Sequence, residues 1–356
     1  MKVLVGLSGG VDSSVAAFIL KQQGYEVIGA TMSIWGKDAL VSKSGHKNAC
    51  YGPDEKEDID AARKIAAQLD IPYYVFDCVN QYESIVLKNF KSEYLSGRTP
   101  NPCVWCNALV KFGVLPHLAR ENGIAFDKFA TGHYARIEEH NGIFTLKRGI
   151  APKKDQSYFL YRLKQDQLKN IILPLGNYTK EEVRKIAEAN GLEAADKPDS
   201  QDFYSGDYNE LLDISDKEGN IISADGKVLG KHKGFWNYTI GQRKGLGVSS
   251  NEPLYVLALK KETNEVVVGA LDKTFKKSLT AVNLNKIDKN RFKLPCRVQA
   301  KIRSTQQPVD VTLNPVDDDK IQVIFDEYQK SIALGQSVVF YDNDVVLGGG
   351  IIDSAE

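Results

Sequence analysis

The sequence has 356 residues, more than one ordinary hydrophobic core accommodates, so two or three domains are expected. Its 42% of hydrophobic residues include no apolar run near the roughly 18 residues of a membrane span, which excludes a helical membrane protein. The formal net charge is zero, which argues against a protein that coats nucleic acid indiscriminately. Five cysteines in a chain without an export signal favour thiols or metal ligands over disulfides, and they predict a cytoplasmic protein with no membrane partner.

Strands and helices alternate in the first part of the chain. The apolar run at 2–7 is predicted to be a buried strand, followed by a Gly/Ser turn and a helix that Gly24 ends. Further strands are expected at 25–32, 72–77 and 126–131, and further helices at 59–69 and 179–191. This alternation predicts an α/β fold, a Rossmann-like parallel sheet covered on both faces, with ligands at the carboxyl ends of its strands.

The pattern changes after about residue 205, where short β-rich runs alternate with Gly, Asn and Asp turns. Strands are expected at 253–259, 265–269, 296–302, 309–313, 321–325, 337–341 and 345–351. Those beyond residue 280 are typical of a small barrel or sandwich, and we predict a barrel. The expected domains are therefore an α/β domain at 1–205, a small β-rich central domain at 206–279 and a C-terminal β-barrel at 280–356.

Two stretches are basic although the whole chain is neutral. Residues 227–244 contain five Lys or Arg and no acid, and residues 273–303 contain ten Lys or Arg against the single Asp288. Such runs are often only solvated surface. The alternative is that they bind a polyanionic substrate.

The motif Ser-Gly-Gly-Val-Asp-Ser-Ser at 8–14 lies between the first strand and the first helix. It places backbone N–H groups and serine hydroxyls around an anion at the amino end of a helix. The Lys of the Gly-x-x-x-x-Gly-Lys-Ser/Thr loop is absent, so β,γ cleavage of the nucleotide is not implied. Asp12 suits a magnesium ion on the phosphates and is predicted to be catalytic. A tight glycine turn without a ligand is the alternative.

This motif resembles the loop of PP-loop enzymes, which adenylate a carbonyl oxygen and release pyrophosphate. Several families share the loop, and five further motifs narrow the choice. They lie at 101–107 (Asn-Pro-Cys-Val-Trp-Cys-Asn, with Lys-Phe-Gly at 111–113), 130–136, 154–160, 198–202 and 238–247. Together they resemble the bacterial tRNA-specific 2-thiouridylases over nearly the whole chain, from the first strand to Gly349.

The resemblance implies 2-thiolation of the wobble uridine of tRNA. ATP with Mg²⁺ would activate the C2 oxygen of the base, and a sulfur nucleophile would displace AMP. The residues implied to hold ATP are Gly6, Leu7, Ser8, Gly9, Gly10, Val11, Asp12, Ser13, Met32 and Gly132. The residues implied to meet tRNA are Asn101, Pro102, Cys103, His133, Lys154, Asp155, Gln156, Arg303, Ser304 and Gln336. For His133 a purely structural role is the alternative.

The sequence departs from the family pattern at the cysteines that handle sulfur. The family uses a nucleophile in Asn-Pro-x-x-x-Cys, which Cys106 matches, and a persulfide carrier, whose position Tyr204 occupies. Tyrosine cannot hold sulfur. Cys103 stands where many relatives have Asp and is counted with Cys106 as catalytic. Cys50 lies in a loop after the second strand, so we expect it to approach this pair at the carboxyl edge of the sheet.

Four interpretations of these thiols stay open. They are a dithiol redox pair, a zinc site that lacks an obvious fourth ligand, unrelated reduced thiols, and three thiolates around an iron–sulfur cluster. We favour a 4Fe–4S cluster on Cys50, Cys103 and Cys106, because its open iron could bind sulfide and replace the missing carrier. The sulfur donor itself, a persulfide carrier or sulfide, is left open. Cys78 and Cys296 are predicted to be packing residues.

Two rival functions remain from the sequence. One is another PP-loop ligase or amidotransferase that acts on a small molecule or on a different tRNA base. The other is a tRNA-binding or ATP-binding paralogue without chemistry, suggested by the missing carrier cysteine. Binding of tRNA, and release of AMP and pyrophosphate in its presence, would separate the three.

Overall fold

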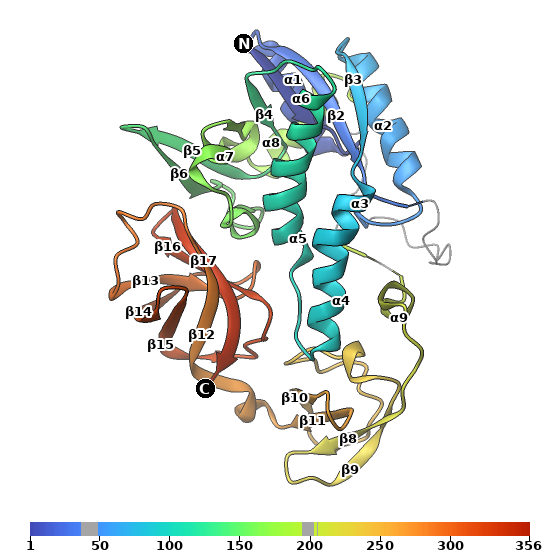
Figure 1. Cartoon of the computed structure of the whole chain (residues 1–356), viewed down its shortest axis with the longest axis vertical. Helices are drawn as coiled ribbons and strands as arrows, with labels where there is room; N and C mark the ends of the chain where they lie inside the picture. The colour runs from blue at the N-terminus through green and yellow to red at the C-terminus, as the bar shows by residue number, and fades with distance from the viewer. Residues whose placement is uncertain (37–48, 194–202, 205) are drawn as a thin grey trace.

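The computed structural model describes residues 1–36, 49–193, 203–204 and 206–356, and the predicted motif at 198–202 lies outside them. A parallel α/β sheet, a small four-stranded sheet and a β-barrel make up the molecule (Figure 1). The predicted fold class, a Rossmann-like domain followed by β-rich domains, is confirmed. Within the described ranges, no helix has both the length and the apolar character that crossing a bilayer would require.

The parallel sheet has the strand order β3-β2-β1-β4-β7. Its strands are β1 (Lys2–Gly6), β2 (Glu26–Ser33), β3 (Tyr73–Asp77), β4 (Lys128–Ala130) and β7 (Ile171–Ile172). Successive residues of β1 enter different cores: Val3 and Val5 pack with helices α1 (Val11–Gln22), α2 (Glu55–Gln68) and α8 (Lys180–Ala189), whereas Leu4 packs with the helices of the other face. Both faces are therefore covered, as alternating strands and helices predict.

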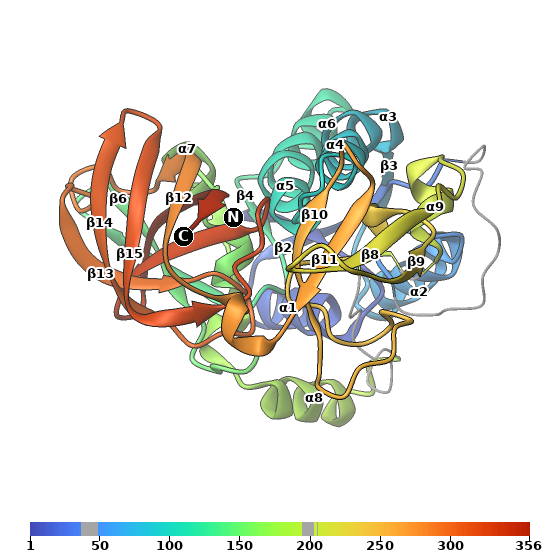
Figure 2. The same cartoon turned by 90° about the horizontal axis from the view of Figure 1, so that it is seen from below.

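The other face carries two long helical runs, each interrupted by a π-helical segment. The first run is α3 (Val79–Tyr82), η1 (Glu83–Leu87) and α4 (Lys88–Leu95). The second is α5 (Pro102–Trp105), η2 (Cys106–Val114) and α6 (Leu115–Glu121). The two runs lie side by side and extend from the sheet toward the small sheet (Figures 1 and 2). Because π-helical segments are rare and concentrate at functional sites, we expect a functional site along these two helical runs.

A hairpin that the sequence did not predict connects the first domain to the barrel. It consists of β5 (Ala135–His140) and β6 (Ile143–Arg148), and Lys147 of β6 pairs with Val345 of β17 in the barrel. The short elements η3 (Ser157–Leu160), α7 (Gln165–Leu168) and η4 (Pro174–Asn177) follow. The hairpin thus places the carboxyl edge of the parallel sheet beside the barrel.

The central region contains α9 (Tyr208–Leu212) and a sheet with the order β10-β11-β8-β9. Of its strands, β10 (Tyr255–Lys260) and β11 (Glu265–Gly269) were predicted, whereas β8 (Gly219–Ser223) and β9 (Val228–His232) were not. The short helices η5 (Phe235–Asn237) and η6 (Leu271–Thr274) complete the region.

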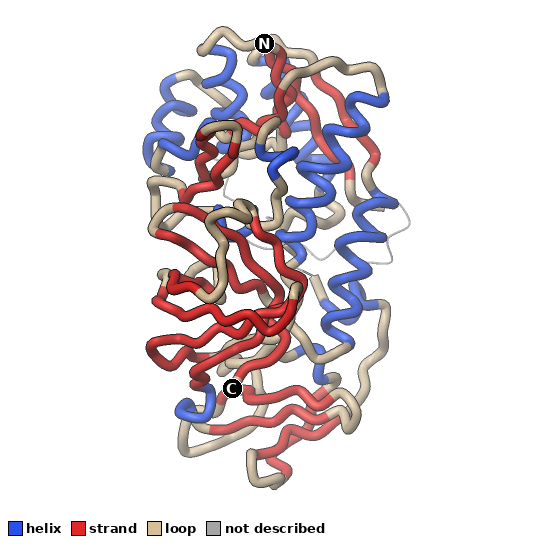
Figure 3. Tube along the Cα trace, turned by 60° about the vertical axis from the view of Figure 1, so that its left-hand side comes forward, coloured by secondary structure: helices blue, strands red, loops and turns tan. Residues whose placement is uncertain are grey.

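The C-terminal strands form a closed barrel, which confirms the predicted architecture. They are β12 (Phe275–Lys286), β13 (Cys296–Lys301), β14 (Val309–Asp317), β15 (Lys320–Lys330), β16 (Ser337–Asp342) and β17 (Val345–Ala355). The order β12-β15-β14-β13-β16-β17 closes because β12 also pairs with β17. The barrel is the group of red strands beside the C-terminus in Figure 3. Ile321, Val323 and Phe325 alternate along β15 into the barrel core, which is the period-two pattern of a one-sided strand.

Candidate active site between the parallel sheet and the barrel

The phosphate loop, residues 8–14, joins β1 to α1 and is held by its own serines. The Ser8 amide donates to Ser13 Oγ at 3.1 Å, while the Ser13 and Ser14 hydroxyls donate to the Gly10 carbonyl at 3.0 and 2.9 Å. Gly10 caps α1 without a side-chain hydrogen bond among the described residues, so the first amides of the helix keep their donors for a ligand. An anion such as a nucleotide phosphate fits this arrangement.

Two of the predicted nucleotide-binding glycines permit close backbone packing. Gly9 has φ +70°, and a Cβ there would lie 2.6 Å from the Asp58 carbonyl oxygen. A Cβ on Gly132, just after β4, would lie 2.7 Å from the carbonyl carbon of Asp12. The end of β4 therefore packs directly on the phosphate loop. Any larger residue at either position would push the loop away from its ligand.

Asp12 has partners that the sequence did not reveal. Its Oδ1 accepts from Lys180 Nζ at 2.7 Å and from the Tyr134 hydroxyl at 2.8 Å, and the Lys180 side chain is only 8% exposed. Lys180 is 168 residues distant in the chain, which explains why no local pattern indicated it. Oδ2 has no hydrogen-bond or ion-pair partner within the described part of the chain.

The cysteine pair, Cys103 and Cys106, lies at the start of the second helical run. Asn101 caps α5, and Pro102 occupies its first turn, where the missing amide costs nothing. Burial raises the pKa of Cys103 to about 12 and that of Cys106 to about 11; the charge of nearby Cys50 raises both, and Lys111 opposes it. A thiol of pKa about 11 is ionised in only about one molecule in ten thousand at neutral pH. The pair is therefore protonated in the unliganded protein.

Cys50 is exposed and lies near the position of the missing sulfur carrier. The amide of its neighbour Tyr51 donates to the Phe203 carbonyl at 3.1 Å, and the Tyr51 ring lies 6.4 Å from that of Tyr204. The structure thus brings Cys50 close enough to the cysteine pair to affect its pKa, as the sequence suggested. No three Cys, His, Asp or Glu side chains converge on a metal-binding point anywhere in the described residues. The three thiols are neighbours, but they are not arranged as ligands.

His133 lies at the carboxyl end of β4, beside the phosphate loop. Its Nδ1 is 2.6 Å from Thr131 Oγ1, and its ring is 5.6 Å from that of Phe112 in η2. Burial, and secondly the charge of Lys111, hold the pKa of His133 well below its usual value. The imidazole is therefore neutral at pH 7, so it is available as a hydrogen-bonding group and not as a cation.

Several residues predicted to meet tRNA gather where the barrel touches the start of the cysteine motif. Gln336 donates from Nε2 to the Pro100 and Thr99 carbonyls at 2.8 and 3.2 Å, which fixes the chain just before Asn101. Burial lowers the pKa of Arg303, which lies near two tyrosines. Ser304 follows it and is partly buried. Asn101, Arg303 and Gln336 are therefore brought together, although they span more than half of the chain.

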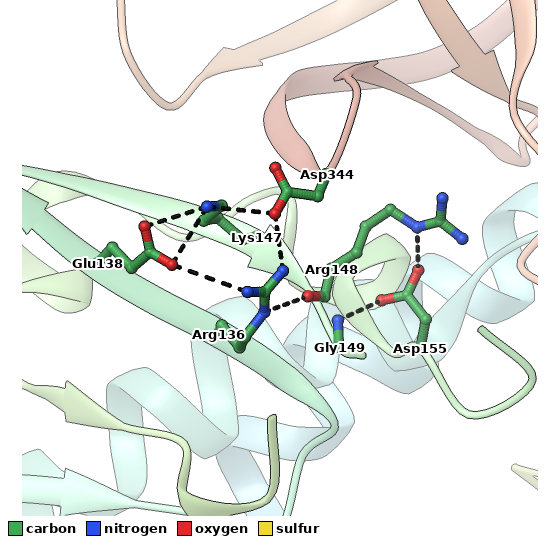
Figure 4. Close-up of polar contacts among 7 residues, drawn as sticks. All are labelled: Arg136, Glu138, Lys147, Arg148, Gly149, Asp155 and Asp344. Carbon is green, nitrogen blue, oxygen red and sulfur yellow. Dashed lines mark hydrogen bonds and ion pairs between the residues drawn. The ribbon is translucent and has the colours of Figure 1, made fainter. Parts of the chain in front are cut away.

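The motif at 154–156 has a structural part that the sequence did not show. The Asp155 carboxylate is 0% exposed; it accepts from Arg148 Nε at 3.0 Å and from the Gly149 amide at 3.3 Å (Figure 4). It also accepts from the Ser157 amide at 3.1 Å. Gln156 Oε1 accepts from the Tyr134 amide at 2.9 Å. Both side chains therefore anchor the chain between the hairpin and the phosphate loop. A direct contact of Asp155 with RNA would require these bonds to open.

The same region ties the hairpin to the barrel. Asp344, in the turn between β16 and β17, accepts from Arg136 at 2.7 Å and forms an ion pair with Lys147 at 3.2 Å (Figure 4). Glu138 lies 3.1 Å from Lys147 on the other side. These partly exposed ion pairs add to the backbone pairing of β6 with β17, so the barrel has a defined position relative to the site.

The basic stretches are less free than their sequence indicates. Lys231 pairs with Glu218 and Lys233 with Asp216 in the central region. In the second stretch, Arg291 pairs with Asp342, Arg297 with Asp326, and Lys301 is buried near Asp155. Acidic residues from other segments of the chain therefore neutralise much of the positive charge of these two stretches. Arg243 and Lys244 are exposed, and the structure gives neither an ion pair among the residues it describes.

The fold and the phosphate loop place the protein in the class of ATP-using PP-loop proteins. Residues 1–204 match the family described as tRNA methyl transferase HUP domain. Residues 212–270 match the tRNA methyl transferase PRC-barrel domain, and residues 276–352 match the aminomethyltransferase beta-barrel domain.

Full-length relatives define the family more narrowly. The tRNA-specific 2-thiouridylase MnmA of Endomicrobium trichonymphae is 49% identical, with 99% of each chain covered. The enzymes of the same name from Acetivibrio thermocellus and Clostridioides difficile are 46% and 44% identical, again over 99% of this chain and 99% and 98% of theirs. The chain belongs to the tRNA-specific 2-thiouridylase family, which confirms the resemblance found in its motifs. Among solved structures, NMN synthetase from Francisella tularensis is a distant likeness, with a TM-score of 0.34, 17% identity and 60% and 72% of the two chains covered.

Proposed function

We propose that this chain forms 2-thiouridine at the wobble position of tRNA. ATP adenylates the C2 oxygen of the base with release of pyrophosphate, and a sulfur nucleophile then displaces AMP. The observation that carries the proposal is the phosphate loop beside a cysteine pair, in a chain whose relatives along their whole length are named tRNA-specific 2-thiouridylases. Adenylation is chemically necessary because a ring carbonyl oxygen is a poor leaving group.

The phosphate loop and its surroundings would bind ATP. Its amides and serines face the phosphates, while Gly132 keeps the end of β4 packed against it. Asp12 would hold Mg²⁺ through Oδ2, with Oδ1 fixed by Lys180 and Tyr134. The ion would neutralise phosphate charge. Lys180 thus sets the orientation of the Asp12 carboxylate before any ligand arrives.

The junction of barrel and catalytic domain would receive the tRNA. Gln336 donates to the carbonyls of residues 99 and 100, which lead into Asn101 and the cysteine motif, and Arg303 lies near Tyr94 and Tyr158. A base received at this junction would approach the start of that motif. Arg243 and Lys244 offer unpaired charge for the RNA backbone from the central region. The buried Asp155 carboxylate stabilises this junction, because it pairs with Arg148 and accepts a hydrogen bond from the Gly149 amide.

Sulfur would be held by the thiol cluster, defined as Cys50, Cys103 and Cys106. Tyr204 cannot carry it, and Cys50 lies beside the segment where the carrier would stand. The proposal has two forms. In one, Cys106 bears a persulfide delivered by a donor; in the other, the three thiolates ligate a 4Fe–4S cluster. The three side chains do not converge on one point, so the second form requires them to rearrange.

The test is an anaerobic reaction with ATP, Mg²⁺ and tRNA, run once with sulfide and once with a persulfide donor, because sulfide alone cannot convert a thiol to a persulfide without an oxidant. Pyrophosphate, AMP and 2-thiouridine are measured in the same samples. We expect all three products, each dependent on tRNA. Pyrophosphate release that needs a small molecule instead of tRNA would favour another PP-loop ligase. Binding of tRNA without any pyrophosphate release would favour a non-catalytic paralogue. Iron and acid-labile sulfide, measured on anaerobically purified protein, separate the two forms of the sulfur site.

A further inference from the structure

Lys111 lies on the same helical segment as Cys106, five residues further on. Five residues correspond to about 500° in an α-helix, which would leave the two side chains about 140° apart. The segment Cys106–Val114 is π-helical, however, and its hydrogen bonds join residues five positions apart. The wide turn therefore sets Lys111 one turn along from Cys106 on nearly the same face.

A glutamine from another element supports this wide turn. Gln167 of α7 donates from Nε2 to the Ala108 carbonyl at 2.8 Å and to the Phe112 carbonyl at 3.2 Å. Its Oε1 accepts from the Lys164 amide at 3.1 Å, which fixes the orientation of the amide group. Both accepting carbonyls belong to the π-segment, where the α-helical pattern is lost. Gln167 thus satisfies groups that the widened helix exposes.

Lys111 is partly buried and carries a charge with no compensating acid. Within the described residues, no hydrogen bond or ion pair is found for its ammonium group. Its charge lowers the pKa values of Cys103, Cys106 and His133. The next residue, Phe112, contacts His133 at the end of β4. Lys111 therefore lies between the cysteine pair and the edge of the sheet that carries the phosphate loop. Partial burial of an unpaired cation lowers stability, so its position calls for an anionic partner.

We propose that Lys111 is the counter-ion of the sulfur anion held at the cysteine pair during transfer to the base, and that Gln167 positions it by supporting the π-helical turn. The inference rests on the proposed function, because it takes the anion to be sulfur delivered to an adenylated tRNA. Lys111 forms and breaks no bond. It stabilises negative charge beside two partly buried thiols, where such stabilisation is stronger than in open solvent.

The first test compares Lys111→Met with Lys111→Arg, and with Lys88→Met, which removes an exposed lysine on the neighbouring helix α4. We expect Lys111→Met to lower the rate of 2-thiouridine formation about 100-fold. Release of pyrophosphate should change far less, so pyrophosphate should exceed 2-thiouridine in that variant alone. Lys111→Arg should recover most of the loss. Equal loss of both products, or unchanged thiolation in Lys111→Met, would overturn the inference.

The second test detects the charge without catalysis. Alkylation of Cys106 by anionic iodoacetate is compared with alkylation by neutral iodoacetamide, with the site of reaction identified by peptide mass. The ratio of the two rates should fall several-fold in Lys111→Met and in Gln167→Met, and stay at the wild-type value in Lys88→Met. An unchanged ratio in Lys111→Met means that its charge does not reach Cys106. Because this readout needs no activity, it distinguishes failure of the inference from failure of the proposed function, which a wild type without tRNA-dependent products would show.

Discussion

The phosphate loop and the thiol cluster are assembled in opposite ways. The loop consists of consecutive residues whose serines hydrogen-bond within the same turn, so its geometry follows from a short piece of sequence. The thiol cluster combines Cys50, from the stretch between β2 and α2, with Cys103 and Cys106 at the start of the second helical run, and these segments meet only in the folded chain. The backbone of the loop takes its shape locally and only the Asp12 side chain relies on distant partners, Lys180 and Tyr134. The thiol cluster depends on every segment that frames it.

The largest expected effect belongs to the local site. Asp12→Asn keeps the shape of the side chain but removes its charge, which pairs with Lys180 and which the proposed Mg²⁺ would need. We expect tRNA-dependent pyrophosphate release to fall at least about 1000-fold, because metal-assisted stabilisation of phosphate charge is lost. Binding of tRNA in a gel shift should stay near normal. A variant that still released pyrophosphate at the wild-type rate would remove Asp12 from the adenylation site.

The assembled site should respond as one unit. If the thiol cluster ligates iron, Cys50→Ala, Cys103→Ala and Cys106→Ala should each lose the iron and nearly all thiolation, and the losses should not add in double variants. If Cys106 acts alone as a persulfide, Cys50→Ala should be almost silent, and Cys103→Ala should cost only its influence on Cys106. The measurement is 2-thiouridine together with iron content for each variant.

Cys296→Ala is the control for this series, since Cys296 lies in the barrel, away from the site. It should cost about 1 kcal/mol of stability and no chemistry. Cys78 is a poorer control, because it is fully buried at the end of β3 and lies close enough for the charge of Cys106 to affect its pKa. A fully active Cys50→Ala protein, or an active wild type without iron, would exclude the cluster.

Substitutions at the junction of the barrel and the catalytic domain should lower the stability of the protein more than its catalytic rate. Asp155→Asn removes a buried carboxylate and leaves Arg148 and Lys301 without their acid, which should cost about 3 kcal/mol of unfolding free energy. Asp344→Asn is the matched exposed change, at 43% exposure, and should cost less than about 1 kcal/mol. Urea unfolding of the two variants measures the difference. Equal effects would mean that burial of Asp155 contributes little to the junction.

The same contrast explains which parts of the fold and of the site could be predicted from the sequence. Hydrophobic periodicity predicted the sheet and the barrel because each strand buries one or both faces, and the phosphate loop was predicted because its residues are contiguous. The hairpin β5–β6, with exposed Glu138, Glu139 and His140 at its tip, offers no such pattern. Lys180, Gln167 and Tyr134 act through contacts across the chain that no spacing reveals. The domain limits at 205 and 279, the roles of the site residues and the cytoplasmic location stay predictions.

The smallest expected effect compares basic residues that are paired with acids in the folded protein with basic residues that are not. By sequence alone, Lys231 and Lys233 look as suitable for RNA as Arg243 and Lys244, but the structure pairs the first two with Glu218 and Asp216. The double variant Arg243→Gln/Lys244→Gln should therefore weaken tRNA binding a few-fold and lower the log–log salt slope by less than about two units, since each phosphate contact contributes under about one. The matched variant Lys231→Gln/Lys233→Gln should change the affinity and the salt slope less, because each of these lysines already pairs with an acid in the free protein. The acid left behind is exposed, so solvent and salt screen its repulsion of the RNA. Titrations of binding at several salt concentrations measure slope and affinity together. A larger change in the second variant would show that tRNA displaces Glu218 and Asp216, so that the linear charge run, and not its pairing in the free protein, determines where the RNA binds.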